Sequence, residues 1–401
     1  MVALRTIAWI AAACCLAAGM AIAQQDQPQE QAPPPRTLKV GPGEKYAKPS
    51  AAIAAANKGD TVEIAPGTYQ NDWCSVRRDR LTLRGLVDAE GRKPLLKSSG
   101  SINNGKAIWV VSGHNVTVEN IDFAGARVKD HNGAGIRAEG RNLTVRGCKF
   151  SDCENGILGG GSDPRSEMLI EHCEFAGCGL RGQSHNLYIS AIGKLTFRYN
   201  YTHRAKEGHL LKSRARENHI LYNRIAEEET GSGSYEINLP NGGKAVIMGN
   251  VIHQGPKSQN SSMLAYGEEG MKYQANSVYV INNTFINELG KGIFVNIRSR
   301  SVEPPVLIAN NIFVGRGELC SYPKAELKSN VTDDPQFVDR ATWNLHVKAD
   351  SPCVNNGAQL PAADGVSFVP AFQYVHPCSM AKRTDDGKTV GAYEVARTSR
   401  P

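Results

Sequence analysis

Residues that could transfer protons recur about two dozen positions apart in the middle of the chain. His185 and Tyr188 are followed by His209 and Lys212, and Asn238 falls one further step along. On an acidic sugar, a base could remove the proton next to the carboxylate and an acid could protonate the leaving oxygen. A cation would neutralise the carboxylate. This set indicates β-elimination on a uronic-acid polysaccharide, provided that the fold brings the residues together.

Several roles remain open within this set. Lys212, beside other cations, would have a lowered pKa and could be the base. His185 or His209 is the alternative base, because the ordinary pKa of histidine lies nearer neutrality. The other catalytic candidates are Tyr188 and Arg214. The candidates for substrate binding are Asn186, Asn238, Glu236, Arg216 and Tyr266.

An irregular repeat indicates which elements position these residues. Its unit is an apolar residue, two spacers, Asn or Cys, one spacer, then Phe or Ile, as in VRGCKF and IANNIF. Eight units begin at residues 118, 145, 170, 197, 220, 247, 280 and 308. Their alternation has a period of two and they are rich in β-branched residues, which indicates strands. A strand–turn circuit of this length is typical of one coil of a parallel β-helix.

Stacking of the coils would put equivalent residues about 4.8 Å apart in columns. The fourth residue of each unit forms one column, whose amides are expected to hydrogen-bond along the stack. From the second unit onward it consists of Cys148, Cys173, Asn200, Asn223, Asn250, Asn283 and Asn311. On a later strand of each coil, alternation directs Leu187, Leu211 and Ile237 inward. It therefore directs the column Tyr188, Lys212 and Asn238 outward.

Together these features resemble the right-handed parallel β-helix proteins of the pectate-lyase-like superfamily. Residues 40–69 are similar to the family's N-terminal helical cap, and residues 334–357 and 391–394 to its closing segment. The resemblance implies an all-β fold, a single-stranded right-handed parallel β-helix with an N-terminal helical cap. It covers roughly residues 40–395 and is more specific for fold than for function.

Within that superfamily, the chain resembles the β-helix alginate lyases and chondroitinase B. These enzymes use a lysine and an arginine on neighbouring coils, with calcium in many members. Lys212, in GHLLKSRA, matches the position of that lysine. The arginine expected one coil later is absent from YEINLPNGG, which leaves Arg214 as its substitute. The calcium-binding carboxylates are not matched, since Glu236 stands alone, so calcium is implied by the resemblance only.

The N-terminus predicts export. Residues 1–23 have the charged, apolar and small-residue regions of a signal peptide, and residues 24–36 are a Pro/Gln-rich linker. Residues 37–395 are expected to form the β-helix domain, with a C-terminal cap from about residue 320. We expect a periplasmic or secreted monomer that has no membrane segment after cleavage. Eight cysteines remain after the signal, an even number that favours disulfides, and none has zinc-site spacing.

Composition limits the partners. The net charge of +7 suits an acidic partner, and export argues against nucleic acid and for an acidic polysaccharide. Glycoside hydrolysis needs two carboxylates, whereas the face from 185 to 239 offers only Glu236. Two alternatives to a polysaccharide lyase stay open. One is a uronate C5-epimerase, which shares the proton abstraction, and the other is a non-catalytic β-helix that binds exopolysaccharide.

Overall fold

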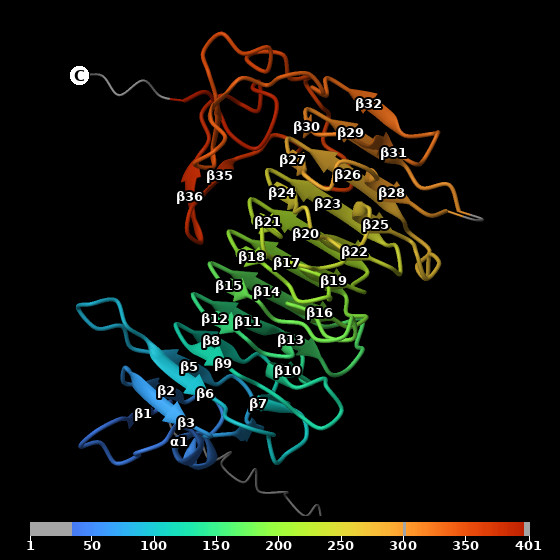
Figure 1. The fold of residues 1–401 in the computed structure, drawn as a ribbon. Coiled ribbons are helices and arrows are strands. Elements are labelled where there is room, and N and C mark those ends of the chain that lie inside the picture. The colour runs from blue at the N-terminus through green and yellow to red at the C-terminus, as the bar shows by residue number, and fades with distance from the viewer. Residues whose placement is uncertain (1–33, 300–301, 397–401) are drawn as a thin grey trace, which may run out of the picture. The chain divides into compact units, whose positions relative to one another are not determined.

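A computed structural model describes residues 34–299 and 302–396, and this part of the chain is built almost entirely from parallel strands (Figure 1). The chain passes repeatedly through three sheets, and each coil adds one strand to each of them. We call them the first, second and third sheets, in the order in which a coil such as β14–β15–β16 visits them. The predicted signal peptide, residues 1–23, lies outside the described residues, as does most of the predicted linker.

The first sheet has 12 strands in the described residues. They are β1 (Thr37–Val40), β2 (Thr61–Ile64), β5 (Thr82–Gly85), β8 (Thr117–Glu119), β11 (Leu143–Arg146), β14 (Glu167–Glu171), β17 (Lys194–Arg198), β20 (Glu217–Leu221), β23 (Lys244–Met248), β26 (Ser277–Ile281), β29 (Val306–Ala309) and β32 (Glu326–Lys328). The first residues of each repeat unit lie in this sheet.

The second and third sheets have 10 strands each in the same part of the chain. The second consists of β3 (Gly67–Gln70), β6 (Pro94–Lys97), β9 (Asp122–Ala124), β12 (Lys149–Ser151), β15 (Glu174–Ala176), β18 (Tyr201–His203), β21 (Arg224–Ala226), β24 (Val251–Gln254), β27 (Thr284–Asn287) and β30 (Ile312–Val314). The third consists of β4 (Cys74–Val76), β7 (Ala107–Val111), β10 (Ala134–Ala138), β13 (Asn155–Gly159), β16 (Leu187–Ile189), β19 (Leu211–Ser213), β22 (Ile237–Leu239), β25 (Ser262–Tyr266), β28 (Ile293–Ile297) and β31 (Glu318–Cys320).

The asparagine column forms the hydrogen-bonded ladder that the repeat predicts. The side-chain oxygen of Asn223 accepts from the backbone N–H of Asn200 at 2.9 Å and from its amide at 3.1 Å. The same pair of contacts joins Asn250 to Asn283 and Asn283 to Asn311. The ladder ends with Asn330, beyond the last repeat unit. All its members up to Asn311 are fully buried, so each rung satisfies polar groups that water cannot reach.

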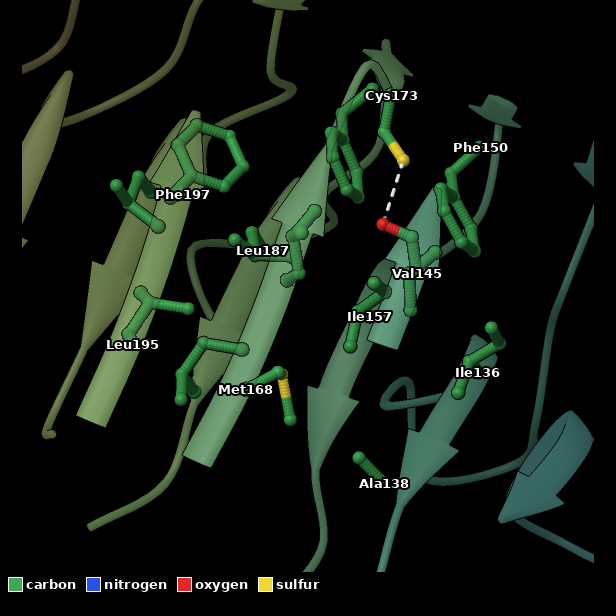
Figure 2. Close-up of a cluster of buried hydrophobic side chains, with 14 of the residues drawn as sticks. Ile136, Ala138, Val145, Phe150, Ile157, Met168, Cys173, Leu187, Leu195 and Phe197 are labelled. Carbon is green, nitrogen blue, oxygen red and sulfur yellow. Dashed lines mark hydrogen bonds between the residues drawn. The ribbon is translucent and has the colours of Figure 1, made fainter. Parts of the chain in front are cut away.

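Aromatic and aliphatic columns fill the interior between the sheets. Phe123, Phe150 and Phe175 stack face to face, with ring centroids 5.0 and 4.9 Å apart. Figure 2 shows Phe150 and Phe197 packed with aliphatic side chains from several coils. The side chains predicted to point inward from the third sheet are buried: Leu187, Ile189, Leu211, Ser213, Ile237 and Leu239. The burial of these side chains therefore confirms the predicted register of the coils.

One helix occurs in the described residues, α1 (Pro49–Ala55), which buries Pro49, Ala52 and Ile53. It lies inside the segment 40–69, for which the sequence predicts a helical cap, and it contacts β1, β2 and β4. The structure is otherwise strands and turns. The capping role of this short helix stays a prediction. No helix in this part of the chain is long and apolar enough to cross a membrane.

The last part of the chain packs back on the coils and includes two antiparallel pairs. These are β33 (Phe337–Asp339) with β34 (Asn344–Val347), and β35 (Phe372–Val375) with β36 (Ser379–Lys382). Phe372 makes edge contacts with the rings of Tyr199 and Tyr222. The Tyr222 hydroxyl accepts from the backbone N–H of Ala371 at 3.0 Å. The cap and domain boundaries predicted from the sequence stay predictions.

The expectation of disulfides is wrong for the described residues, where all eight cysteines are free thiols. Most of them are buried and pack as small apolar groups. Cys148 and Cys173 lie in the core, and the Cys173 thiol donates to the Val145 carbonyl oxygen at 3.6 Å (Figure 2). The Cys378 thiol donates to the Cys173 carbonyl oxygen at 3.2 Å. Thus the even cysteine count reflects coil packing.

Candidate functional site

The outward column of the third sheet is built as the sequence predicts. Tyr188 in β16 is the register partner of Lys212 in β19, which in turn pairs with Asn238 in β22. The Lys212 ammonium lies 5.6 Å from the centre of the Tyr188 ring. The Lys212 side chain is only 15% exposed. Residues 24 positions apart are therefore neighbours on one face.

Two histidines stack beside this column, as the register predicts. The rings of His185 and His209 lie 4.5 Å apart and nearly parallel. The His185 Nδ1 accepts from the backbone N–H of His209 at 3.0 Å. In the same way, the His209 Nδ1 accepts from the backbone N–H of Tyr235 at 3.3 Å. We call His185, Tyr188, His209, Lys212 and Arg214 the third-sheet patch.

These contacts argue against the alternative in which a histidine is the base. Burial lowers the pKa of His209 to about 3, and burial together with the nearby His209 lowers that of His185 well below its ordinary value. Both rings are therefore neutral near pH 7. Because Nδ1 accepts a backbone hydrogen bond in each ring, the single proton lies on Nε2. Each ring can donate a hydrogen bond but has no free nitrogen to take up a proton.

Arg214 connects the patch to the loop that follows β25. Its Nε donates to the Tyr188 hydroxyl at 2.9 Å and one terminal nitrogen donates to the Asn241 side-chain oxygen at 3.0 Å. Its two terminal nitrogens also hold the Glu269 carboxylate in a fork, with one contact of 2.8 Å. The same carboxylate lies 3.6 Å from the Lys212 ammonium. A carboxylate is thus already bound between the two cations of the patch.

The electrostatic surroundings lower the pKa of Lys212 below its ordinary value. Burial is the largest cause that lowers its pKa, and the positive charge of Arg214 adds to it. Glu269 opposes both, because its negative charge stabilises the ammonium. In turn, the Arg214 hydrogen bonds lower the pKa of Glu269, which keeps this carboxylate ionised. Removal of the Glu269 charge, with no other carboxylate in its place, would therefore lower the Lys212 pKa further.

Three of the residues proposed to bind substrate are placed differently by the structure. Asn186 is fully buried, and its amide donates to the Thr202 hydroxyl at 3.0 Å. Glu236 is also fully buried, in the same inward column as Leu210. Both residues lie just before a strand begins, where the chain turns a corner and simple alternation does not apply.

Tyr266 is the third of these corrections. A role in substrate binding needs an accessible ring, but Tyr266 is fully buried. It pairs in register with the inward residue Leu239, and its hydroxyl donates to the Gly243 carbonyl oxygen at 2.5 Å. Asn238 is nearly buried within the outward column. Arg216 is exposed beyond the end of β19, and its role in substrate binding stays a prediction.

Sequence reasoning missed Arg298, which lies near the patch. Arg298 contacts the Glu268 carboxylate at 3.1 Å, and the same carboxylate accepts from the Tyr235 hydroxyl at 2.6 Å. A cavity of about 420 Å³ lies here, lined by the loop 267–272 and Arg298. The pairing of Tyr266 with Ile297 puts Arg298 next to Gly267, so the coil register could have found it.

The residues present do not fit the calcium that the sequence resemblance implies. The described residues contain no group of three or more Asp, Glu, His or Cys side chains that could hold a metal ion. Glu236 faces the interior, whereas Glu268 and Glu269 are paired with arginines. A calcium site needs six to eight oxygen ligands, which this face does not gather.

Comparison with known proteins agrees with this fold. The family model described as "Right handed beta helix region" matches residues 85–225. The match covers less than half of the chain and agrees with the stacked parallel coils seen in the three sheets. A search of curated proteins gives no match.

Solved structures with the same kind of fold are only distantly similar. Pectate lyase Pel9A is 14% identical, with a TM-score of 0.47, over 90% of this chain and 96% of its own. The pectin methylesterase from Aspergillus niger is 13% identical, with a TM-score of 0.35, over 75% and 86%. The PL6 family alginate lyase AlyGC is 13% identical, with a TM-score of 0.33, over 88% of this chain and 56% of its own. The chain thus spans little more than half of AlyGC.

Proposed function

We propose that the third-sheet patch cleaves a uronate-containing polysaccharide by β-elimination. The observation that carries this proposal is the Glu269 carboxylate, which is held by both terminal nitrogens of Arg214 and lies 3.6 Å from Lys212. Glu269 belongs to a loop, and its side chain is 45% exposed. A substrate carboxylate could take its place on Arg214 with the same forked geometry.

Lys212 is the base in this proposal. Its amine is next to the bound carboxylate, and its pKa is lowered by burial and by Arg214. Neutralisation of the substrate carboxylate by Arg214 makes the proton on the adjacent carbon more acidic. The amine takes that proton, and the C–H electron pair forms the new C=C bond as the C–O bond to the leaving sugar breaks.

Tyr188 is the acid in this proposal. Its oxygen accepts from Arg214, and no hydrogen bond donated by its own O–H occurs in the described part of the chain. That proton is therefore available for the leaving glycosidic oxygen. The Nε2–H of His209, on a partly exposed ring, is placed to bind a sugar hydroxyl or the substrate carboxylate. The reaction thus uses one base, one acid and one carboxylate-binding cation from adjacent coils.

The test is a screen of the full chain against alginate, pectate, glucuronan and glycosaminoglycans. We expect one of them to yield the ultraviolet-absorbing unsaturated sugar, and Lys212→Met to reduce its rate by about 10²- to 10⁴-fold. Lys206→Met is the matched control, because this exposed lysine pairs with Asp152 away from the patch. Solvent deuterium entering an uncleaved polymer would identify an epimerase instead. Retention of the polymer without either product would identify a binding protein.

We also propose that the protein is exported and works as a periplasmic or secreted monomer. The signal-like residues 1–23 support export. Sequencing of the mature N-terminus after expression would test the cleavage, and a full-length cytoplasmic product would contradict it. Size-exclusion chromatography with light scattering would test the monomer.

A further inference from the structure

A second cavity lies on a different face from the third-sheet patch. It has a volume of about 810 Å³ and opens over the second sheet, under the turn that joins β33 to β34. Its walls include Tyr201, Arg224 and His253 from successive strands, and Arg340 and Trp343 from the turn. This volume is within the range of small-molecule sites. No residue of the third-sheet patch lines it.

Arg224 is the central side chain of this cavity. It is 10% exposed and lies between two aromatic rings, with its guanidinium carbon 4.1 Å from the Trp343 ring centre and 5.1 Å from that of Tyr201. A terminal nitrogen donates to Glu228 at 3.0 Å, but the Nε–H is buried without a hydrogen-bond partner. A buried unpaired donor is unfavourable. It is satisfied if a ligand brings an acceptor oxygen into the cavity.

The charges around Arg224 favour an acidic ligand at this wall. Glu228 is shared by Arg224 at 3.0 Å and Arg204 at 3.6 Å, so two guanidiniums face one carboxylate. On the opposite side, Arg340 pairs with Glu288 at 3.1 Å. Glu229 also lines the cavity but is exposed to solvent, which screens it. At this wall the two guanidiniums and the one carboxylate leave a single positive charge, and Arg204 itself is 48% exposed.

Trp343 supplies an aromatic surface at a conformational cost. Its φ of 64° is in the left-handed region, which is unfavourable for a bulky residue. The ring is held there by Arg224 and by an edge contact with His253, at 4.9 Å between centroids. Strained residues that the surroundings hold in place are common at binding sites. A flat ring beside several hydrogen-bonding groups is complementary to a sugar, whose C–H face is apolar and whose edges are polar.

We infer that this cavity binds the terminal sugar of an acidic saccharide. The acid group faces Arg204 and Arg224, and the sugar ring lies against Trp343. The inference rests on the cavity's own residues and not on the proposed elimination, because the two sites lie on different sheets and share no side chain. A chain held at this cavity would be retained whether or not the third-sheet patch cleaves it.

The test follows Trp343 fluorescence in the full chain during titration with a trigalacturonate. We expect saturable binding, and about ten-fold weaker binding for Arg204→Ala because one of the two guanidiniums that face the acid group is lost. Arg92→Ala is the matched control, since this exposed arginine is also paired with a carboxylate but lies far from the cavity. In Trp343→Phe the fluorescence change should disappear, while calorimetry still detects binding.

Three outcomes would overturn the inference. They are the absence of a fluorescence change, equal binding of neutral maltotriose, or the same response to inorganic phosphate alone. Lys212→Met separates the two proposals, because it should stop cleavage and leave this titration unchanged. Loss of both functions in that variant would show that a single site accounts for them.

Discussion

Glu227 offers a quantitative test of how burial in the interior changes the pKa of a carboxyl group. Its side chain is fully buried, and neither carboxyl oxygen makes a hydrogen bond of standard geometry. Burial raises its pKa from the ordinary 4.5 to about 8, although the nearby backbone amides of Gly233 and Ala205 partly oppose the shift. The folded protein therefore holds this proton at neutral pH, whereas the unfolded chain releases it.

The sign of the effect follows from that difference in bound protons. Between pH 4.5 and 8 the folded state binds more protons, so the stability from Glu227 is complete below this window and is lost as the pH rises through it. At pH 7 the loss is about 3 kcal/mol, at roughly 1.4 kcal/mol per pKa unit. Glu227→Gln keeps the size and removes the titration. It should therefore stabilise the protein by about this amount at pH 7 and by little at pH 4.5.

The assay is urea unfolding of the wild type and variant from pH 4.5 to 8, followed by circular dichroism. Glu229→Gln is the matched control, because the Glu229 carboxylate is close to Glu227 in the sequence but is exposed. The two unfolding midpoints should diverge with rising pH for Glu227→Gln only. Parallel pH curves for the wild type and Glu227→Gln would refute the reasoning, since they would show that the buried carboxyl does not titrate between these limits.

Four further predictions concern the patch and the core. The rate of cleavage should rise with pH until Lys212 loses its proton, at a pKa below the ordinary value of lysine. A kcat/KM profile that rises only around the ordinary pKa of histidine and then levels off would contradict this. Glu269→Gln should lower KM, because it removes the charge that competes for Arg214; an unchanged or higher KM in steady-state kinetics would argue against displacement. Asn250→Leu should destabilise the protein by on the order of 3 kcal/mol in urea unfolding, since it leaves the Ile220 carbonyl and the Asn223 N–H unpaired; a loss near zero would mean that water replaces the rung. Chelators should leave cleavage unchanged, and inhibition that calcium reverses would reveal a metal site.

The coil register could be predicted from the sequence because one residue type recurs at one corner. The Asn200–Asn311 column and the Tyr188–Lys212 pairing both followed from it and are both present. The alternation of inward and outward side chains failed next to the corners of a coil. There the Asn186 side chain is buried, although it lies beside the outward column. Alternation also failed for Tyr266, which pairs in register with the inward residue Leu239.

Contacts made by loops and by the end of the chain could not be predicted in this way. The fork between Arg214 and Glu269 joins residues 55 positions apart through a loop of irregular length. The cavity at Arg224 depends on Trp343, which returns from more than a hundred residues away. Neither contact follows the repeat, so no period in the sequence reports it. The free thiols were misjudged because export was used to infer oxidation, whereas coil packing places them.

The asparagine ladder separates the length of a coil from its place in the stack. Successive rungs keep the same contacts of about 2.9 Å, although 23 residues separate Asn200 from Asn223 and 33 separate Asn250 from Asn283. The additional residues of the longer coil include the loop that carries Glu268 and Glu269 to the patch. New surface chemistry can therefore be gained by lengthening one turn, while every layer above and below keeps its position.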